Sequence, residues 1–148
     1  MENNKIVLFQ EKQVRRVWHD KRLTDEWKNR GIKEGQEYSI LTAEISKATF
    51  GMTPTEYRAL KGLDKQNLRD HMTHIELIFS MLGEETTRQL AIRDDAQGFN
   101  QNSEAAIGGG NLAARARADF EKTTGNKVIT AANFTELDKP DEKLRLKK

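Results

Sequence analysis

The sequence predicts a mainly α-helical domain of four to five helices, with a short N-terminal β-hairpin that a C-terminal strand would join. Three observations support this class. Apolar residues recur at three- and four-residue spacing between positions 35 and 82. Helix start and stop signals flank these stretches. Short runs of β-branched and aromatic residues lie mainly in the first twenty positions and at 128–130.

The N-terminal runs KIVLF and QVRRVW flank a polar bridge, Gln10-Glu11-Lys12, which predicts a β-hairpin. A hairpin of two strands is only marginally stable in water. It therefore needs either another strand of this chain or a partner chain. The strand candidate within the chain is Val128, Ile129 and Thr130.

The helical pattern begins at Leu23. Thr24 is the expected N-cap of a short helix that Gly31 closes. A second helix is expected from about Gly35 to Phe50, where Gly51 stops it.

A complete helix start signal follows in Met52-Thr53-Pro54-Thr55-Glu56-Tyr57. Thr53 is the N-cap, Pro54 the first helical residue and Glu56 the partner in a capping box. This helix is expected to end at Gly62. Asp64 is then the predicted cap of a long helix through Leu82, in which Gly83 favours a kink or an early end.

The sequence changes character after Asp95. Residues 97–111 are polar and rich in glycine, which predicts a loop. The last helix is expected from Leu112 to about Thr123, with Gly125 as its C-terminal cap. The tail at 135–148 is highly charged and is expected to be disordered.

Composition excludes several function classes. The 148 residues contain no cysteine, which excludes a disulfide framework, a thiolate zinc site and a thiol nucleophile. No stretch approaches the roughly 18 uninterrupted apolar residues of a membrane span. The N-terminus lacks the pattern of a secretory signal. We therefore expect a cytoplasmic protein that does not act at a membrane.

The net charge of +2 conceals an uneven distribution. Residues 1–22 carry a net +3, whereas residues 67–97 carry −3. Lys12, Arg15 and Arg16 of the hairpin are candidate contacts to a phosphate backbone or to an acidic protein surface. Alternatively, these cations protect an exposed edge strand from pairing with other chains.

A second group of cations, Arg58, Lys61, Lys65 and Arg69, recurs at three- and four-residue spacing, which predicts a basic ridge. Such a ridge would contact phosphates. The alternative is an ordinary solvated helical surface of mixed charge.

No catalytic, cofactor or metal site is expected. His71 and His74 lie three residues apart but supply at most two ligands. Gly108-Gly109-Gly110-Asn111 lacks the preceding strand and the following Lys-Ser or Lys-Thr pair of a phosphate-binding loop, so a hinge or a helix break is expected. No serine has a neighbouring His and carboxylate that predict a catalytic arrangement, so we expect a non-enzymatic protein.

Two segments, TPTEYRALKGL and NLRDHMTHIEL, carry a family resemblance that extends over about residues 22–134, including FEKTTGNKVITAANF. This region resembles the C-terminal region of the bacterial DNA-damage-inducible protein D family. Members of that family join a BRO-type antirepressor N-terminal domain to this helical region. KIVLFQEKQVRRVWHD resembles the opening strands of the BRO-type domain, but LTDEW follows almost at once, so the interior of that domain is missing here.

The resemblance implies three parts: a remnant hairpin at 1–20, a helical domain at 22–134 and a charged tail at 135–148. It also implies a non-enzymatic role in the DNA-damage (SOS) response or in prophage regulation. Two hypotheses follow. The partner is a protein, namely a recombinase filament, a repressor or a second copy of the chain as a homodimer. Alternatively, the hairpin and the basic ridge bind DNA directly.

Overall fold

Helices make up most of the chain that the computed structural model describes, residues 21–133. A helical segment at 21–29 precedes the labelled elements, which are α2 (Gln36–Phe50), α3 (Pro54–Leu60), the 3-10 helix η1 (Leu68–His71), α4 (His74–Arg93) and α5 (Gly98–Thr124). The mainly α-helical class is confirmed. The predicted hairpin at 1–20 and the tail at 135–148 lie outside the described residues.

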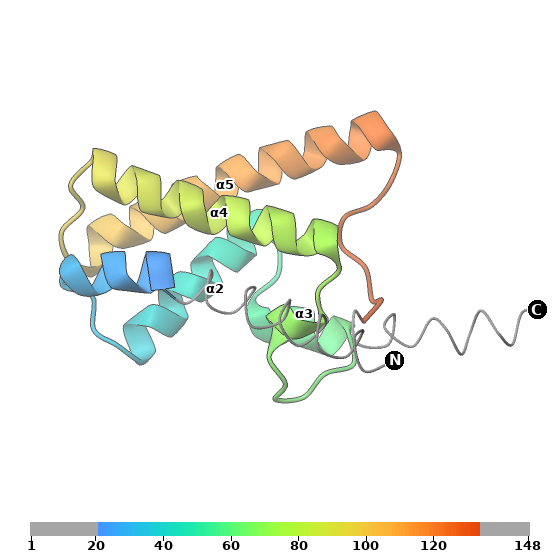
Figure 1. Ribbon diagram of the computed structural model, residues 1–148, viewed down its shortest axis with the longest axis horizontal. Helices are drawn as coiled ribbons and strands as arrows, with labels where there is room; N and C mark the ends of the chain where they lie inside the picture. Colours follow the sequence, from blue (N-terminus) through green and yellow to red (C-terminus); the bar gives the residue numbers. More distant parts are fainter. Residues whose placement is uncertain (1–20, 134–148) are drawn as a thin grey trace, which may run out of the picture.

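The two long helices, α4 and α5, pack against each other along one side of the molecule (Figure 1). A short turn between them reverses the chain, so they run antiparallel, and α2 packs against both. The helical segment 21–29 lies beside this turn, where the Gly98 N–H donates to the Arg30 carbonyl at 2.9 Å. At the opposite end, α3 and η1 lie close to the segment 126–133 that follows α5.

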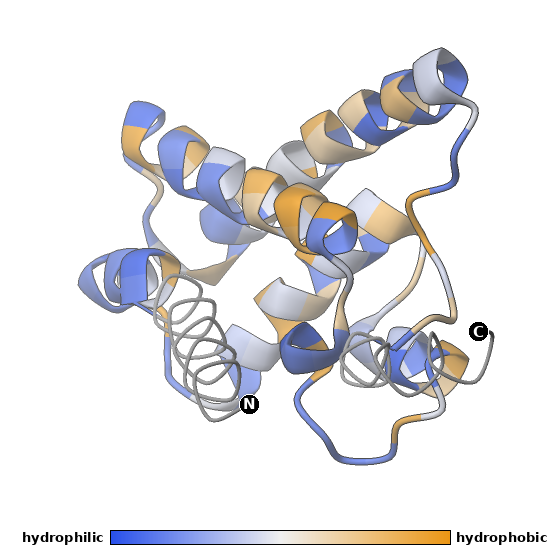
Figure 2. Cartoon of the chain, turned by 45° about the vertical axis from the view of Figure 1, so that its right-hand side comes forward, coloured by the Kyte–Doolittle hydropathy of each residue, from blue (hydrophilic) through white to orange (hydrophobic). Residues whose placement is uncertain are grey.

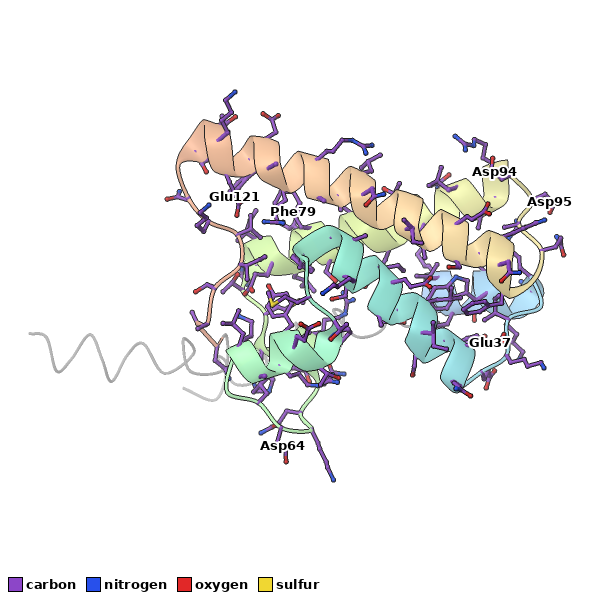
Figure 3. All side chains as sticks on the ribbon, turned by 180° about the vertical axis from the view of Figure 1, so that it is seen from behind. Glu37, Asp64, Phe79, Asp94, Asp95 and Glu121 are labelled. Atoms are coloured by element: carbon purple, nitrogen blue, oxygen red, sulfur yellow. The ribbon has the colours of Figure 1, made fainter. Side chains whose placement is uncertain are left out.

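Apolar side chains from the described helices form the core. Each long helix carries both hydrophobic and hydrophilic residues (Figure 2). One buried cluster surrounds Trp27, Leu41 and Ile45 between the segment 21–29, α2 and α5. A second lies between α3, η1 and α4, and comprises Phe50, Tyr57, Leu68, Met72, Leu77, Phe79 and Val128. Phe79 of α4, labelled in Figure 3, meets Phe120 of α5 edge to face. Their ring centroids are 5.6 Å apart.

The start signal predicted for α3 is confirmed. The Glu56 N–H donates to Thr53 Oγ1 at 3.2 Å, and the Thr53 N–H donates to Glu56 Oε1 at 3.1 Å. Pro54 occupies the first helical position. The reciprocal bonds satisfy two of the backbone donors that a helix start leaves open.

The prediction that Asp64 caps the long helix is wrong. Asp64 lies in the exposed turn after α3 (Figure 3), and the chain passes through η1 before α4 begins at His74. Thr73, in an extended conformation, is the true N-cap, and it forms a second capping box with Glu76. The extended backbone at Met72 and Thr73 prevents η1 and α4 from becoming one helix.

The predicted loop at 97–111 is also wrong, because α5 runs without interruption from Gly98 to Thr124. Gly109 and Gly110 are buried in its middle, where α5 meets α4 and α2. Nor does Gly83 kink or end α4, which continues to Arg93. A methyl group on Gly83 would lie 2.8 Å from Thr49 Oγ1 of α2, so this glycine permits a close approach of two helices.

Smaller differences concern the ends of the described chain. Residue 21 is already helical, so Thr24 lies inside the first helix and is not its N-cap, although Gly31 follows the helix with a φ of 84° as expected. The predicted Gly125 cap is confirmed, with a φ of 74°. The strand predicted at 128–130 is absent, since those described residues are irregular, but Val128 is fully buried in the core.

Candidate functional site

The structure does not place the four cations of the predicted ridge on one surface. Lys65 is exposed and Arg58 is partly buried, whereas Lys61 is 5% exposed and Arg69 is 7% exposed. The ridge prediction assumed helical spacing, but α3 ends at Leu60 and the chain turns before η1 begins at Leu68. Two of the four cations consequently turn into the core. Lys12, Arg15 and Arg16 of the hairpin lie outside the described residues.

Lys61 belongs to a buried polar cluster with Glu76 and Tyr57. Its Nζ donates to Glu76 Oε1 at 2.6 Å, and neither side chain of this ion pair is exposed to solvent. The Tyr57 hydroxyl donates to the other carboxylate oxygen of Glu76. Lys61 Nζ also lies 5.6 Å from the centroid of the Tyr57 ring, within the range of a cation–π contact.

The same ammonium group attaches the segment after α5 to the core. Lys61 Nζ donates to the Thr130 carbonyl at 2.9 Å and to the Ala132 carbonyl at 2.5 Å. Nearby, Asn133 Oδ1 lies 2.8 Å from His71 Nδ1. With Glu76, the two carbonyls occupy the three donors of the ammonium group. Lys61 is therefore a structural cation rather than a surface contact.

Burial, followed by the hydrogen bond to Glu76 and the negative charge of that carboxylate, raises the pKa of the Tyr57 hydroxyl above its ordinary value. Because the folded-state pKa exceeds the unfolded one, this group's contribution to stability is complete below about pH 10 and is lost as the pH rises through the folded-state value. We expect phenolate absorbance to show Tyr38 and Tyr57, the only tyrosines, ionising in separate steps. The second step should coincide with the loss of the helical circular dichroism signal.

The variant Tyr57→Phe provides the control for this titration. It should retain the first step and lack the second. Ionisation of both tyrosines in one step, with the helical signal unchanged, would contradict the assignment.

A second buried ion pair joins η1 to α4. Arg69 Nη2 donates to Glu84 Oε1 and, at 3.2 Å, to Ser80 Oγ. The Ser80 hydroxyl lies 3.2 Å from the same carboxylate oxygen, to which it donates. The other amino group of Arg69, Nη1, is buried and has no hydrogen-bond partner in the part of the chain that the structure describes.

Arg69 and Glu84 also line a cavity of about 400 Å³ between α2, the start of α3, the turn at 65–69 and α4. Arg58 and Lys65, the two ridge cations that remain accessible, lie in the same lining. The structure thus brings three of the four predicted ridge residues to one cavity, while Lys61 points into the core elsewhere. This cavity is the candidate functional site.

Within residues 21–133, no group of three or more His, Asp or Glu side chains is placed to hold a metal ion. His71 lies against Asn133, and His74 is the first residue of α4. None of the helices described here combines the length and the apolar character needed to span a membrane.

Sequence reasoning missed the acidic partners of both buried cations. Glu76 was detectable, since Thr73-His74-Ile75-Glu76 repeats the capping-box spacing of Thr53 and Glu56. Glu84 was not, because its pairing with Arg69 depends on how η1 packs against α4.

Comparisons with protein-family models, with curated proteins and with solved structures found no match to this chain.

Proposed function

We propose that this chain is a non-enzymatic regulatory protein of the DNA-damage response or of prophage control, and that it acts in the cytoplasm by contacting another protein. The partner is a recombinase filament, a repressor or a second copy of the chain. The proposal rests on the resemblance of residues 22–134 to the C-terminal region of the DNA-damage-inducible protein D family. A feature of the described surface supports it.

That feature is a set of large aliphatic side chains on the outer faces of the helices. Ile78 of α4 is the most exposed of them, at 56%. The others are Ile40, Leu60, Ile92, Ile107 and Leu112. Apolar side chains buried in a contact are removed from water, which stabilises association between proteins and contributes little to binding a phosphate backbone.

The distribution of charge supports a protein partner over DNA. Residues 21–133 contain 16 Lys and Arg and 16 Asp and Glu, so their formal net charge is zero. Lys61 and Arg69 are neutralised by Glu76 and Glu84 inside the core. Binding to a phosphate backbone depends on accessible cations that displace counterions.

Direct DNA binding is the second candidate. Arg58 and Lys65 remain near the surface, and Lys12, Arg15 and Arg16 would add three cations. If this candidate holds, affinity for DNA falls steeply as salt rises, and replacing Arg15 and Arg16 with alanine weakens it.

The variant Ile78→Glu tests the protein-contact proposal. With a purified recombinase assembled on single-stranded DNA as the partner, we expect binding to weaken at least about tenfold, because a charge at the centre of an apolar contact is desolvated. The circular dichroism spectrum should be unchanged, since Ile78 is exposed. Co-sedimentation measures the binding, and light scattering of the free chain shows whether it self-associates.

Gln89→Glu, which places the same charge at another exposed position of α4, is the matched control and should bind like the wild type. A monomeric chain that does not bind the filament would contradict contact with a recombinase or with itself. Wild-type affinity in both variants would show that Ile78 is not part of the contact with the partner.

A further inference from the structure

The cavity lined by Arg69 has both charged and apolar residues in its lining. Arg58, Lys65 and Arg69 contribute three positive charges and Glu84 one negative charge, so the lining carries a net charge of +2. Ile45 and Phe50 of α2, with Leu68 and Met72, supply apolar surface to the same lining. Its volume of about 400 Å³ falls within the range of roughly 300–1,000 Å³ typical of small-molecule sites.

The hydrogen bonding of Arg69 is incomplete. A guanidinium group has five N–H donors, and Nη2 of Arg69 serves both Glu84 and Ser80. Nη1 is buried without a partner among the described residues, although a buried donor without an acceptor is destabilising. Thr49 Oγ1, from another lining residue, is likewise buried without a described partner.

We propose that this cavity binds a small organic phosphate monoester. Two negative charges on the phosphate match the net +2 of the lining, and planar guanidinium groups recognise phosphate oxygens with paired hydrogen bonds. The organic body packs against Phe50, Leu68 and Met72. Since surrounding atoms cover Nη1, the guanidinium of Arg69 rotates toward the cavity when the phosphate binds.

The occupied cavity would connect α2, α3, η1 and α4, whose residues all contribute to its wall. The ligand therefore stabilises the arrangement of these four elements, as any ligand that binds only the folded state does. This inference is independent of the proposed protein partner, because Ile78 is not among the lining residues.

The experiment uses the full chain and phenyl phosphate, which combines a dianionic phosphate with an apolar ring. Calorimetry should show saturable binding, with inorganic phosphate and phenol each binding more weakly. The double variant Arg58→Gln/Lys65→Gln should weaken binding about tenfold or more. The double variant Lys28→Gln/Lys122→Gln removes the same charge from exposed positions outside the cavity, so it should bind like the wild type.

Glu84→Gln tests the role of Arg69 without removing the cation. Loss of the competing carboxylate should tighten the binding of phenyl phosphate severalfold, an increase that general destabilisation of the fold would not produce. Any of three results would overturn the proposal. The first is no binding of phenyl phosphate up to about 10 mM, which corresponds to negligible affinity. The others are equal losses of affinity in the two double variants, and inorganic phosphate binding as tightly as the ester.

Discussion

Replacing Lys61 with methionine is expected to lower the free energy of unfolding by about 3–5 kcal/mol, because removal of one partner leaves a buried charge uncompensated. Glu76 would keep its hydrogen bond from Tyr57 but lose its cation in a site without solvent exposure. The carbonyl groups of Thr130 and Ala132 would lose their donor as well. Denaturation by urea, followed by circular dichroism, measures the change.

A double-mutant cycle separates the ion pair from the packing of the lysine stem. Glu76→Gln keeps the shape of the side chain and removes its charge, so the double variant Lys61→Met/Glu76→Gln should be more stable than the sum of the single effects predicts. A loss below about 1 kcal/mol in Lys61→Met, or strict additivity in the cycle, would contradict a buried ion pair of this kind.

Replacing Gly110 with alanine is expected to destabilise the protein by about 1–3 kcal/mol or more, because a methyl group here overpacks the contact between α5 and α2. The added carbon would lie 2.5 Å from the Ala48 methyl and 2.8 Å from the Ile45 carbonyl oxygen. Gly109 is similarly confined, since a methyl there would lie 2.5 Å from the Thr87 backbone nitrogen. Backbone atoms cannot move aside without separating the helices.

Gly108→Ala is the matched control in the same turn of α5. A methyl at this position meets only the end of the Leu90 side chain, at 3.0 Å, and that side chain can move. Alanine also favours a helix over glycine by about 1 kcal/mol, so the net change should stay within about 1 kcal/mol. Equal thermal stability of the Gly110→Ala and Gly108→Ala variants would contradict the close packing of α5 on α2.

Local signals predicted the parts of the fold that local interactions determine. The capping box of Thr53 and Glu56 depends on two residues three positions apart, so the sequence located the start of α3 correctly. The end of α2 at Gly51 and the end of α5 at Gly125 were predictable for the same reason, as both glycines adopt a positive φ that other residues rarely take.

The failures occur where contacts between helices outweigh local preference. Three consecutive glycines disfavour a helix by about 3 kcal/mol relative to alanine, which predicted a loop at 97–111. In the structure, the absence of side chains at Gly109 and Gly110 lets α5 approach α4 and α2 closely. That packing favours a continuous helix from Gly98 to Thr124, and a single stretch of sequence does not reveal it.

At the candidate site, too, local signals predicted some features and contacts between helices decided the others. The spacing of Arg58, Lys61, Lys65 and Arg69 was read as one surface, but it crosses the end of α3 and a turn. Spacing identified the cations and left their partners undetermined, since Glu76 and Glu84 lie 15 residues from Lys61 and Arg69. Only the packing of α3 and η1 against α4 decides that Lys61 is buried beside Glu76, whereas the other three cations line the cavity.

Fluorescence anisotropy of labelled single-stranded DNA, titrated with the full chain, tests the proposed function most directly. The DNA is used bare and coated with recombinase, each at low and at physiological salt. We expect the chain to bind the coated DNA at both salt concentrations. Bare DNA should show at most a weak affinity that vanishes at physiological salt. Tight binding to bare DNA with a steep loss on adding salt, and no added affinity for the coated form, would contradict it.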